Sequence, residues 1–365
     1  MKNAKLKLDL NALYNNAKYV LDQTDGGVIA TVKNDAFHFG LQRAIDTFYS
    51  AGIRAFATTS LRDAIRIRKM YSDIFILLLN PSTEFELLRE YNLSSTMPGL
   101  SWIKEHKDDL YGINWHLEWA GCMRRSGCKT EDEYLESLKF AKENNISIEG
   151  IWTHFAWADV FNEENIYERE KNRWLKIQKK ACELYDFKYV HAQNSASFCR
   201  DSKFEGHSHV RVGIILYGCP GYEGWDYKGK IQNAVELSAS VVSINKLEPG
   251  ESIGYCASYI ADPNKDCPTS VAVINIGYGD GLLRTRINGH TTEINNKRYN
   301  LVSLMMSHTV AVVDENVKIG DTAYFYSDSI PVFEFTYKGV GTNSEQISHL
   351  NFETLDLEYI EIKEI

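Results

Sequence analysis

The sequence predicts an α/β fold: a parallel (β/α)8 barrel of the TIM type, followed by a C-terminal all-β domain. Two observations predict it. Across the first two thirds of the 365 residues, short apolar runs alternate with amphipathic, helix-like stretches. From Ala234 onward the pattern changes to Val-rich alternating segments separated by Gly, Pro and Asn turns, which is typical of short antiparallel strands.

The first domain is predicted from eight apolar runs with helix-like segments between them, such as Leu41–Ala51, Ser60–Met70 and Thr130–Asn144. Ser60 followed by Asp63 indicates a helix start, because the serine oxygen can accept an open backbone N–H. In a parallel barrel the chemistry lies at the C-terminal ends of the strands. The predicted strands are Val28–Lys33, Arg54–Thr58, Ile74–Leu79, Ser94–Met97, Ile113–Glu118, Ile148–His154, Lys188–Gln193 and His209–Gly213.

The second domain is predicted to begin where the composition changes, near Gly221–Gly229. We therefore expect a barrel domain over residues 1–228 and a β domain over 229–365. The predicted strands of the β domain are Leu237–Ile244, Val271–Ile276, Thr291–Asn295, Val310–Val313 and Thr322–Tyr326.

Charge and composition narrow the classes of partner. The 40 basic and 49 acidic residues give a net charge of −9, which disfavours nucleic acid as a partner. No apolar stretch reaches 18 residues, and the N-terminus MKNAKLKLDL lacks the apolar core of a signal peptide. Seven cysteines are present without a CxxC pair, as expected for reduced thiols. We expect a cytoplasmic protein that binds neither nucleic acid nor membrane and holds no metal.

Polar residues close several of the predicted barrel strands. Lys33 ends the first strand, and a lysine at a barrel rim is usually just solvated. Several other strand ends are polar as well, and they converge on one mouth, which indicates a site. These residues are Glu118, His154, Asn194, Ser195 and Arg211.

Lys33 is therefore a candidate nucleophile. A lysine in a partly desolvated pocket beside other cations has a lowered pKa. Arg211 and His154 are the residues that would provide the positive field. Such an amine can form an imine with a cofactor whose ring acts as an electron sink.

Motifs along nearly the whole chain resemble those of the alanine racemase family of fold-type III pyridoxal 5'-phosphate (PLP) enzymes. Each motif alone is weak, but their order and spacing together are strong. They are VKNDAFHFG (Val32–Gly40), TTSLRDA (Thr58–Ala64), the loop with Met123, Arg125 and Gly127, WTHFAWAD (Trp152–Asp159), HAQNSAS (His191–Ser197), VRVGIILYG (Val210–Gly218), IGYCASY (Ile253–Tyr259) and GYGDGLLRTR (Gly277–Arg286).

The resemblance implies an amino-acid racemase or epimerase with two catalytic bases. Lys33 would bind PLP and act as one base, and Tyr255 would act on the opposite face of the substrate Cα. In this family the tyrosine reaches the barrel of the other subunit, so the enzyme would be a homodimer with shared active sites and a small amino acid as substrate. A phenol needs cationic neighbours to work near neutrality, and His154 is the implied neighbour.

The resemblance also implies how the cofactor is held. Arg211 would face the pyridine nitrogen, and because arginine keeps its proton, the electron sink is weakened. That suits racemisation and argues against the barrel decarboxylases, which place a carboxylate there. Ser195, Gly213 and Ile214 would cradle the phosphate, and Asn194 would support them.

Two departures from the family lie beside the cofactor. Phe37 stands where a phosphate-binding tyrosine is usual, which removes one hydrogen bond. Glu118 stands where many members have a carbamylated lysine, and a glutamate can orient the nearby arginine without modification. Arg125 would be that arginine, in contact with cofactor and substrate carboxylate, and Arg124 is an additional cation.

Further departures affect the substrate. Ser307 and His308 stand where the family tends to have Met and Asp, and Glu345 replaces a tyrosine that narrows the pocket. One hypothesis is that Glu345 receives the far ammonium of lysine, ornithine or diaminopimelate. Diaminopimelate also carries a distal carboxylate, which Arg124, His308 or Arg286 would meet. The alternative is a true alanine racemase. A non-catalytic PLP-binding homologue is disfavoured by the second domain and by the retained Lys33 and Tyr255.

Overall fold

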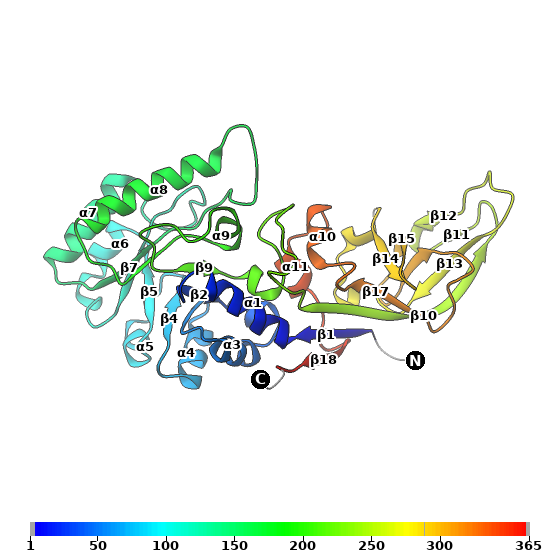
Figure 1. The fold of residues 1–365 in the computed structure, drawn as a ribbon, viewed down its shortest axis with the longest axis horizontal. Coiled ribbons are helices and arrows are strands. Elements are labelled where there is room, and N and C mark those ends of the chain that lie inside the picture. The colour runs from blue at the N-terminus through cyan, green and yellow to red at the C-terminus, as the bar shows by residue number, and fades with distance from the viewer. Residues whose placement is uncertain (1–3, 288, 363–365) are drawn as a thin grey trace. The chain divides into compact units, whose positions relative to one another are not determined.

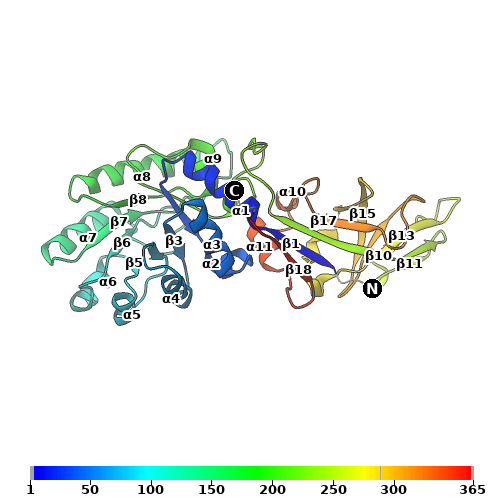
Figure 2. The same cartoon turned by 60° about the horizontal axis from the view of Figure 1, so that its bottom comes forward.

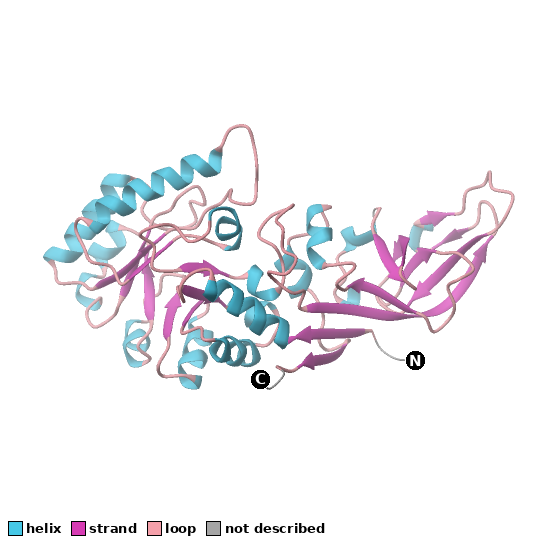
Figure 3. Ribbon diagram, in the orientation of Figure 1, coloured by secondary structure: helices cyan, strands magenta, loops and turns pink. Residues whose placement is uncertain are grey.

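The computed structural model describes residues 4–287 and 289–362. The chain divides into two compact units, one spanning Leu13–Gln232 and the other Met1–Ala12 with Asn233–Ile365. Helices surround the strands in the first unit, whereas strands dominate the second (Figures 1 and 3). No described helix is long and apolar enough to cross a membrane.

The first unit is a parallel barrel of eight strands. Its sheet order is β8-β7-β6-β5-β4-β3-β2-β9, and a parallel bridge between His191 and His209 joins the two ends. All eight strands predicted from the sequence are present; seven are slightly shorter than predicted, and Ser94–Met97 has the predicted bounds. They are β2 (Val28–Thr31), β3 (Ala55–Thr58), β4 (Phe75–Leu78), β5 (Ser94–Met97), β6 (Trp115–Glu118), β7 (Ile148–Trp152), β8 (Tyr189–His191) and β9 (Val210–Val212).

Helices follow the strands and lie outside them (Figure 2). The predicted start at Ser60 is confirmed, because its hydroxyl accepts the Asp63 N–H at 3.2 Å. Thr130 caps the next predicted helix in the same way. The helices are α1 (Leu10–Asp22), α2 (Lys33–Phe37), α3 (Leu41–Ala51), α4 (Leu61–Met70), α5 (Phe85–Glu90), α6 (Leu100–Glu105), α7 (Glu131–Glu143), α8 (Ile166–Cys182) and α9 (Ser195–Asp201), with 3-10 turns η1 (Lys107–Asp109) and η2 (Ile214–Tyr217).

The second unit is a β domain, as predicted, with two short helices added. Its large sheet has the order β13-β16-β15-β14-β17-β10-β1-β18, and a further pairing of β13 with β10 closes part of it into a barrel. Its elements are β1 (Lys5–Asp9), β10 (Val235–Leu247), β11 (Ser252–Ile253), η3 (Tyr255–Ala257), β12 (Tyr259–Ile260), β13 (Thr269–Ile274), η4 (Tyr278–Asp280), η5 (Arg284–Ile287), β14 (Thr291–Ile294), β15 (Lys297–Leu304), β16 (Thr309–Val312), β17 (Thr322–Tyr326), α10 (Val332–Tyr337), α11 (Asn343–Ser348) and β18 (Asp356–Ile360).

The expected division into residues 1–228 and 229–365 needs a correction at the N-terminus. Strand β1 does not join the barrel but pairs antiparallel with β10 and parallel with β18. Its buried residues Leu6 and Leu8 alternate with charged residues, which fits a half-buried sheet rather than a barrel strand. The change of unit on the other side falls between Gln232 and Asn233.

The barrel interior contains both apolar and polar side chains. Ile29, Ala57 and Leu77 are fully buried in one cluster with Tyr189 at its edge. His116, His191 and Arg211 are buried as well, although polar groups rarely line a barrel core. These buried polar groups lead to the site.

Candidate active site

Lys33 lies where β2 passes into a left-handed turn. Residues 34–38 all have positive φ, between 50° and 66°, although none is glycine. This conformation costs about 1–2 kcal/mol per residue for L-amino acids. The Asp35 carboxylate compensates in part, since it accepts the Leu41 N–H at 2.9 Å and ties the turn to α3. Such strain is typical of functional sites and fixes where the lysine stands.

The surroundings of Lys33 make its amine unusually easy to deprotonate. The side chain is half-buried, and burial lowers its pKa; the cations Arg125 and Arg211 lower the pKa further. A larger fraction of the amine is therefore neutral and nucleophilic near neutral pH than for an exposed lysine.

Arg211 on β9 is the buried cation of the site. Its Nη1 donates to His191 Nδ1 at 2.6 Å, and its Nη2 donates to Thr153 O at 2.9 Å and to His154 Nδ1 at 3.1 Å. The guanidinium also lies 4.6 Å from the centre of the Trp152 ring. Burial lowers the pKa of Arg211, but three acceptors and the ring face favour the cation, so the guanidinium keeps its proton.

His154 follows β7 and is neutral. Burial lowers its pKa well below the usual value, and the cations Arg211, Arg125 and Lys33 act in the same direction. Because its Nδ1 accepts from Arg211, which can only donate, the ring proton must sit on Nε2. His154 therefore offers an N–H donor on its other side.

The residues expected to hold a phosphate lie together at the ends of β8 and β9. Ser195 Oγ accepts the N–H groups of Gly213 and Ile215 at 3.2 and 3.3 Å, which leaves its own proton free to donate. Asn194 caps α9, because its Oδ1 accepts the Ser197 N–H at 2.9 Å. Ile214 begins the turn η2 directly after Gly213.

Phe37 lies against the same place. A Cβ added to Gly213 would come within 3.2 Å of the Phe37 ring, so the two residues are in direct proximity. The ring is buried and packs on Tyr217, with centroids 4.7 Å apart. Phe37 therefore contributes packing here and no hydrogen bond.

Glu118 and Arg125 form a second pair at the mouth. Glu118 is buried, accepts a hydrogen bond from Ser126, and lies 3.9 Å from Arg125 Nη2. Burial raises the pKa of Glu118, whereas Ser126, Arg125 and Arg211 oppose that rise. The neighbouring Arg124 is exposed. The loop can approach Glu118 because Gly127 has no side chain; a Cβ there would lie 2.8 Å from Glu118 Cγ.

Together these groups fit an anionic, carbonyl-bearing cofactor such as PLP. The barrel offers an amine of lowered pKa, a hydroxyl and a glycine-containing turn suited to a phosphate, and a buried arginine. A Cβ at Gly221 would collide with Ala196 Cα at 2.7 Å, so the backbone at Gly221 packs closely against the start of α9.

Tyr255 belongs to the other unit and is presented outward. It lies in the loop between β11 and β12, and 74% of the residue is exposed. The loop is strained: Gly254 has φ 84°, and Cys256 and Ala257 have φ 55° and 50°. A Cβ at Gly254 would collide with the hydroxyls of Ser303 and Ser258, so this turn requires glycine.

Among the residues proposed to bind a longer substrate, Glu345 has a structural role at the start of a helix. Glu345 forms a capping box with Thr342: its Oε2 accepts the Thr342 N–H at 3.3 Å, and its own N–H donates to Thr342 Oγ1 at 3.2 Å. Ser307 is exposed and His308 is half-buried in the turn before β16.

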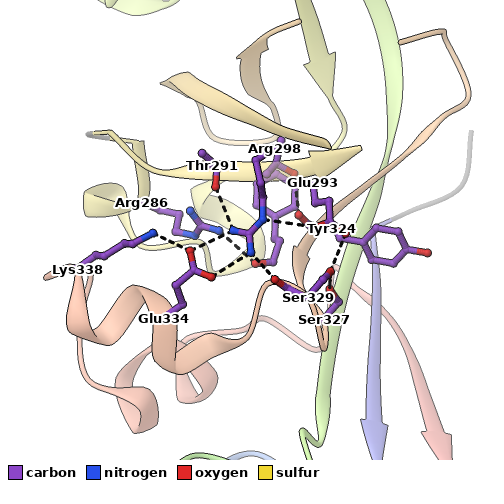
Figure 4. Close-up of polar contacts among 11 residues, drawn as sticks. Arg286, Thr291, Glu293, Arg298, Tyr324, Ser327, Ser329, Glu334 and Lys338 are labelled. Atoms are coloured by element: carbon purple, nitrogen blue, oxygen red, sulfur yellow. Dashed lines mark hydrogen bonds and ion pairs between the residues drawn. The ribbon is translucent and has the colours of Figure 1, made fainter. Parts of the chain in front are cut away.

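The expectation that Arg286 meets a substrate carboxylate is wrong. Arg286 is buried inside the β domain, 3.3 Å from the centre of the Phe335 ring. It lies beside an ion-pair network in which Arg298 and Lys338 share Glu334 (Figure 4). A substrate has no access to a side chain that is 1% exposed.

Sequence reasoning assigned no role to three residues that contact or neighbour the site. Thr153 accepts from Arg211 through its carbonyl, and His191 accepts through its ring. His116 contacts His191 in turn. The two-residue period of a strand places His116 on the same face as Glu118, and this signal could have identified it.

Comparisons with known proteins match both units. The model of the family "Alanine racemase, N-terminal domain" matches residues 8–220, and that of "Alanine racemase, C-terminal domain" matches residues 234–351. A protein of Staphylococcus aureus (strain COL) named alanine racemase 2 is 42% identical over 339 residues, covering 91% of this chain and 92% of that protein. An alanine racemase of Staphylococcus saprophyticus is 27% identical, covering 88% and 84%.

Solved structures show the same fold. The biosynthetic alanine racemase from Pseudomonas aeruginosa superposes with a TM-score of 0.86 at 21% identity, covering 98% of this chain and 99% of that one. The alanine racemase from Bartonella henselae, described with covalently bound pyridoxal phosphate, gives 0.85 at 20% identity, covering 99% and 100%.

Proposed function

The chain belongs to the alanine racemase family, and on that premise we propose that it interconverts L- and D-alanine with Lys33 and Tyr255 as its two bases. Enzymes of this family are PLP-dependent isomerases. The observation that carries the proposal is the arrangement around Arg211, whose guanidinium joins His154 and His191 beside a lysine of lowered pKa.

Lys33 would hold the cofactor through Nζ and would also move a proton. When bound, the cofactor supplies an electron sink that makes the substrate Cα–H acidic. The neutral Lys33 amine would take or return the proton on one face of the substrate Cα. Its lowered pKa supports this role, because a base works best when its pKa lies near the operating pH.

Arg211 would limit how strongly the cofactor ring withdraws electrons from the substrate Cα. Its guanidinium keeps its proton, so it can donate a hydrogen bond but cannot give a full proton to a ring nitrogen. The four contacts that fix it, to His191, Thr153, His154 and Trp152, leave it little freedom to turn away. This supports racemisation rather than decarboxylation.

Tyr255 of the partner subunit is the second base in this proposal, which makes the active enzyme a homodimer. The exposure of the phenol supports it, because a buried phenol could not reach another subunit. The Nε2–H of His154 is a suitable donor to a phenolate, and such a bond would favour the ionised phenol.

Glu118 supports the site by orienting Arg125. Its buried carboxylate lies beside Arg125 and needs no carbamylation to carry a negative charge. Arg125 is half exposed, so it is free at one end to meet the carboxylate of a small amino acid.

Alanine is favoured over a diamino acid as the substrate. One oxygen of the Glu345 carboxylate accepts the Thr342 N–H at the start of α11, so the residue has a structural role that needs no distal ammonium. The match over the second domain likewise supports an enzyme rather than a non-catalytic PLP-binding homologue.

Steady-state racemisation of L-alanine, L-lysine and LL-diaminopimelate tests the substrate. We expect kcat/KM for L-alanine to exceed the others by at least about tenfold, the discrimination expected of a pocket shaped for a small side chain. Glu345→Gln is the matched control and should leave the ranking unchanged. Faster turnover of either diamino acid, lost in Glu345→Gln, would restore the diamino hypothesis.

A further inference from the structure

A line of polar side chains crosses the interior of the barrel below Arg211. His191 on β8 accepts from Arg211, and its Nε2 lies 3.1 Å from Nδ1 of His116 on β6. His116 Nε2 lies 3.8 Å from the carboxylate of Glu149 on β7, an electrostatic contact longer than a hydrogen bond. Both imidazoles are fully buried.

The donors in this line can be assigned by starting from Arg211. A guanidinium can only donate, so His191 Nδ1 must be a bare acceptor. In a neutral ring the proton is then on His191 Nε2, which donates to His116 Nδ1, and the His116 proton is on Nε2, facing Glu149. Burial lowers the pKa of both histidines, which supports the neutral rings.

The wall of the barrel is shaped to admit the His116 ring. A Cβ added to Gly150 on β7 would lie 2.6 Å from His116 Nδ1 and 2.8 Å from Tyr189 O. Any side chain at position 150 would therefore displace the ring from His191. Gly150 does not have a positive φ, so room for the ring, not backbone conformation, accounts for this glycine.

Glu149 is held at the far end of the line. Ser94 Oγ donates to its Oε2 at 3.1 Å, and Lys188 Nζ lies 3.3 Å from its Oε1. Burial alone would raise the pKa of Glu149, but His116 and Lys188 outweigh it and lower the pKa. The line therefore ends on an ionised carboxylate that attracts the His116 N–H.

We propose that His116 and Glu149 are positioning residues, which lock His191 in the Nε2–H tautomer and so hold the Arg211 guanidinium in place at the barrel mouth. The importance of Arg211 rests on the proposed function. Without an acceptor at His116 Nδ1, a proton on His191 Nε2 would be buried without a partner, and this cost would favour moving it to Nδ1 in spite of the Arg211 donor. A proton on Nδ1 would face the Arg211 donors and push the guanidinium away.

The tautomer itself can be measured on the holoenzyme by long-range 1H–15N NMR of ring nitrogens in histidine-labelled protein, with His191→Gln to assign the signals. We expect His191 to show a protonated Nε2 and a bare Nδ1 in the parent, and a growing Nδ1–H population in His116→Leu. A parent His191 that is protonated on Nδ1, or on both nitrogens, would overturn the proposal. This readout requires no turnover, so it stands apart from any failure of the substrate assignment.

Kinetics of a matched pair separate positioning from mere packing. His116→Leu removes the acceptor, whereas the Oδ1 of His116→Asn can take the place of Nδ1. In His116→Leu and Gly150→Ala we expect kcat to fall about tenfold with little change in KM, the effect expected for the loss of one hydrogen bond to a buried group. In His116→Asn, kcat should stay within about threefold of the parent value. Glu149→Gln, at a position whose side chain is 15% exposed, should give an intermediate loss. Equal damage in His116→Leu and His116→Asn, or an unchanged kcat in both, would overturn the proposal; if His116→Leu does not fold, the parent tautomer and Glu149→Gln still decide.

Discussion

The two candidate bases stand in opposite kinds of surroundings. Lys33 is half-buried, and its own chain supplies the cations that lower its pKa. Tyr255 is exposed, and among the described residues none hydrogen-bonds to its hydroxyl. The difference indicates that one base is prepared within its own barrel, whereas the other acquires its surroundings only on meeting a second chain.

The two regions nevertheless share one structural feature, a strained backbone beside the catalytic base. The turn after Lys33 runs through five consecutive residues with positive φ, and the loop of Tyr255 contains Gly254, Cys256 and Ala257 with positive φ. In both places the strain fixes the direction of the functional side chain. The positions of the two bases are thus set by their own local backbone, and only the surroundings of the Tyr255 phenol depend on dimer formation.

The largest effect is expected from Lys33→Ala. Removing both the cofactor anchor and one base should lower racemisation by at least about 10⁴-fold, the upper range for a single acid–base group. The visible absorption of lysine-bound cofactor should vanish as well. Turnover with an intact absorption band would show that another residue holds the cofactor.

A smaller effect, confined to the other base, is expected from Gly254→Ala. The added Cβ meets Ser303 and Ser258, and φ 84° is unfavourable for alanine, at a cost of about 1–3 kcal/mol. Displacing Tyr255 should lower kcat about tenfold or more, while the absorption of the Lys33-bound cofactor stays unchanged. Gly250→Ala is the matched control, because it has a positive φ in the same domain but nothing within 4 Å of its Cβ. If both variants lose the same activity, backbone strain alone, not the placement of Tyr255, explains the loss.

The smallest effect is a shift in pH dependence from Arg125→Met. Arg125 disfavours the protonated form of Lys33, so removing it stabilises the ammonium and raises the pKa of Lys33. Rebinding of PLP to cofactor-free protein requires the neutral amine, and its midpoint should therefore move to higher pH. A stopped-flow titration of the absorption change measures this; a midpoint that is unchanged or lower contradicts the electrostatic role of Arg125. Arg124→Met is the control.

Much of the fold could be predicted from the sequence because its signals are local. Each barrel strand is a short apolar run, and the caps at Ser60 and Thr130 depend on residues three positions apart. The place of β1 could not be predicted in this way. Its alternating pattern indicates a half-buried strand, but its partners β10 and β18 lie more than two hundred residues away in the sequence.

The site divides in the same manner. Lys33, His154, Ser195 and Arg211 were predictable because each lies in or just after the C-terminal part of a strand, and these parts converge in a barrel. The strand period could have placed His116 on the face of Glu118, but its contact with His191 joins residues 75 positions apart and has no local signal in the sequence. Glu345 stays a prediction as a pocket residue; its sequence context, a threonine three residues earlier, also fits a capping box, and the structure contains that box.

The most direct test of a site shared between two chains is complementation. Lys33→Ala and Tyr255→Phe, each inactive alone, are mixed under conditions of subunit exchange, and racemisation of L-alanine is measured. Half of the dimers will be mixed, and one of their two sites will hold both Lys33 and Tyr255, so activity should return to about a quarter of the parent value. No recovery, although differently tagged subunits co-purify as mixed dimers, would contradict the account that the two bases come from different chains.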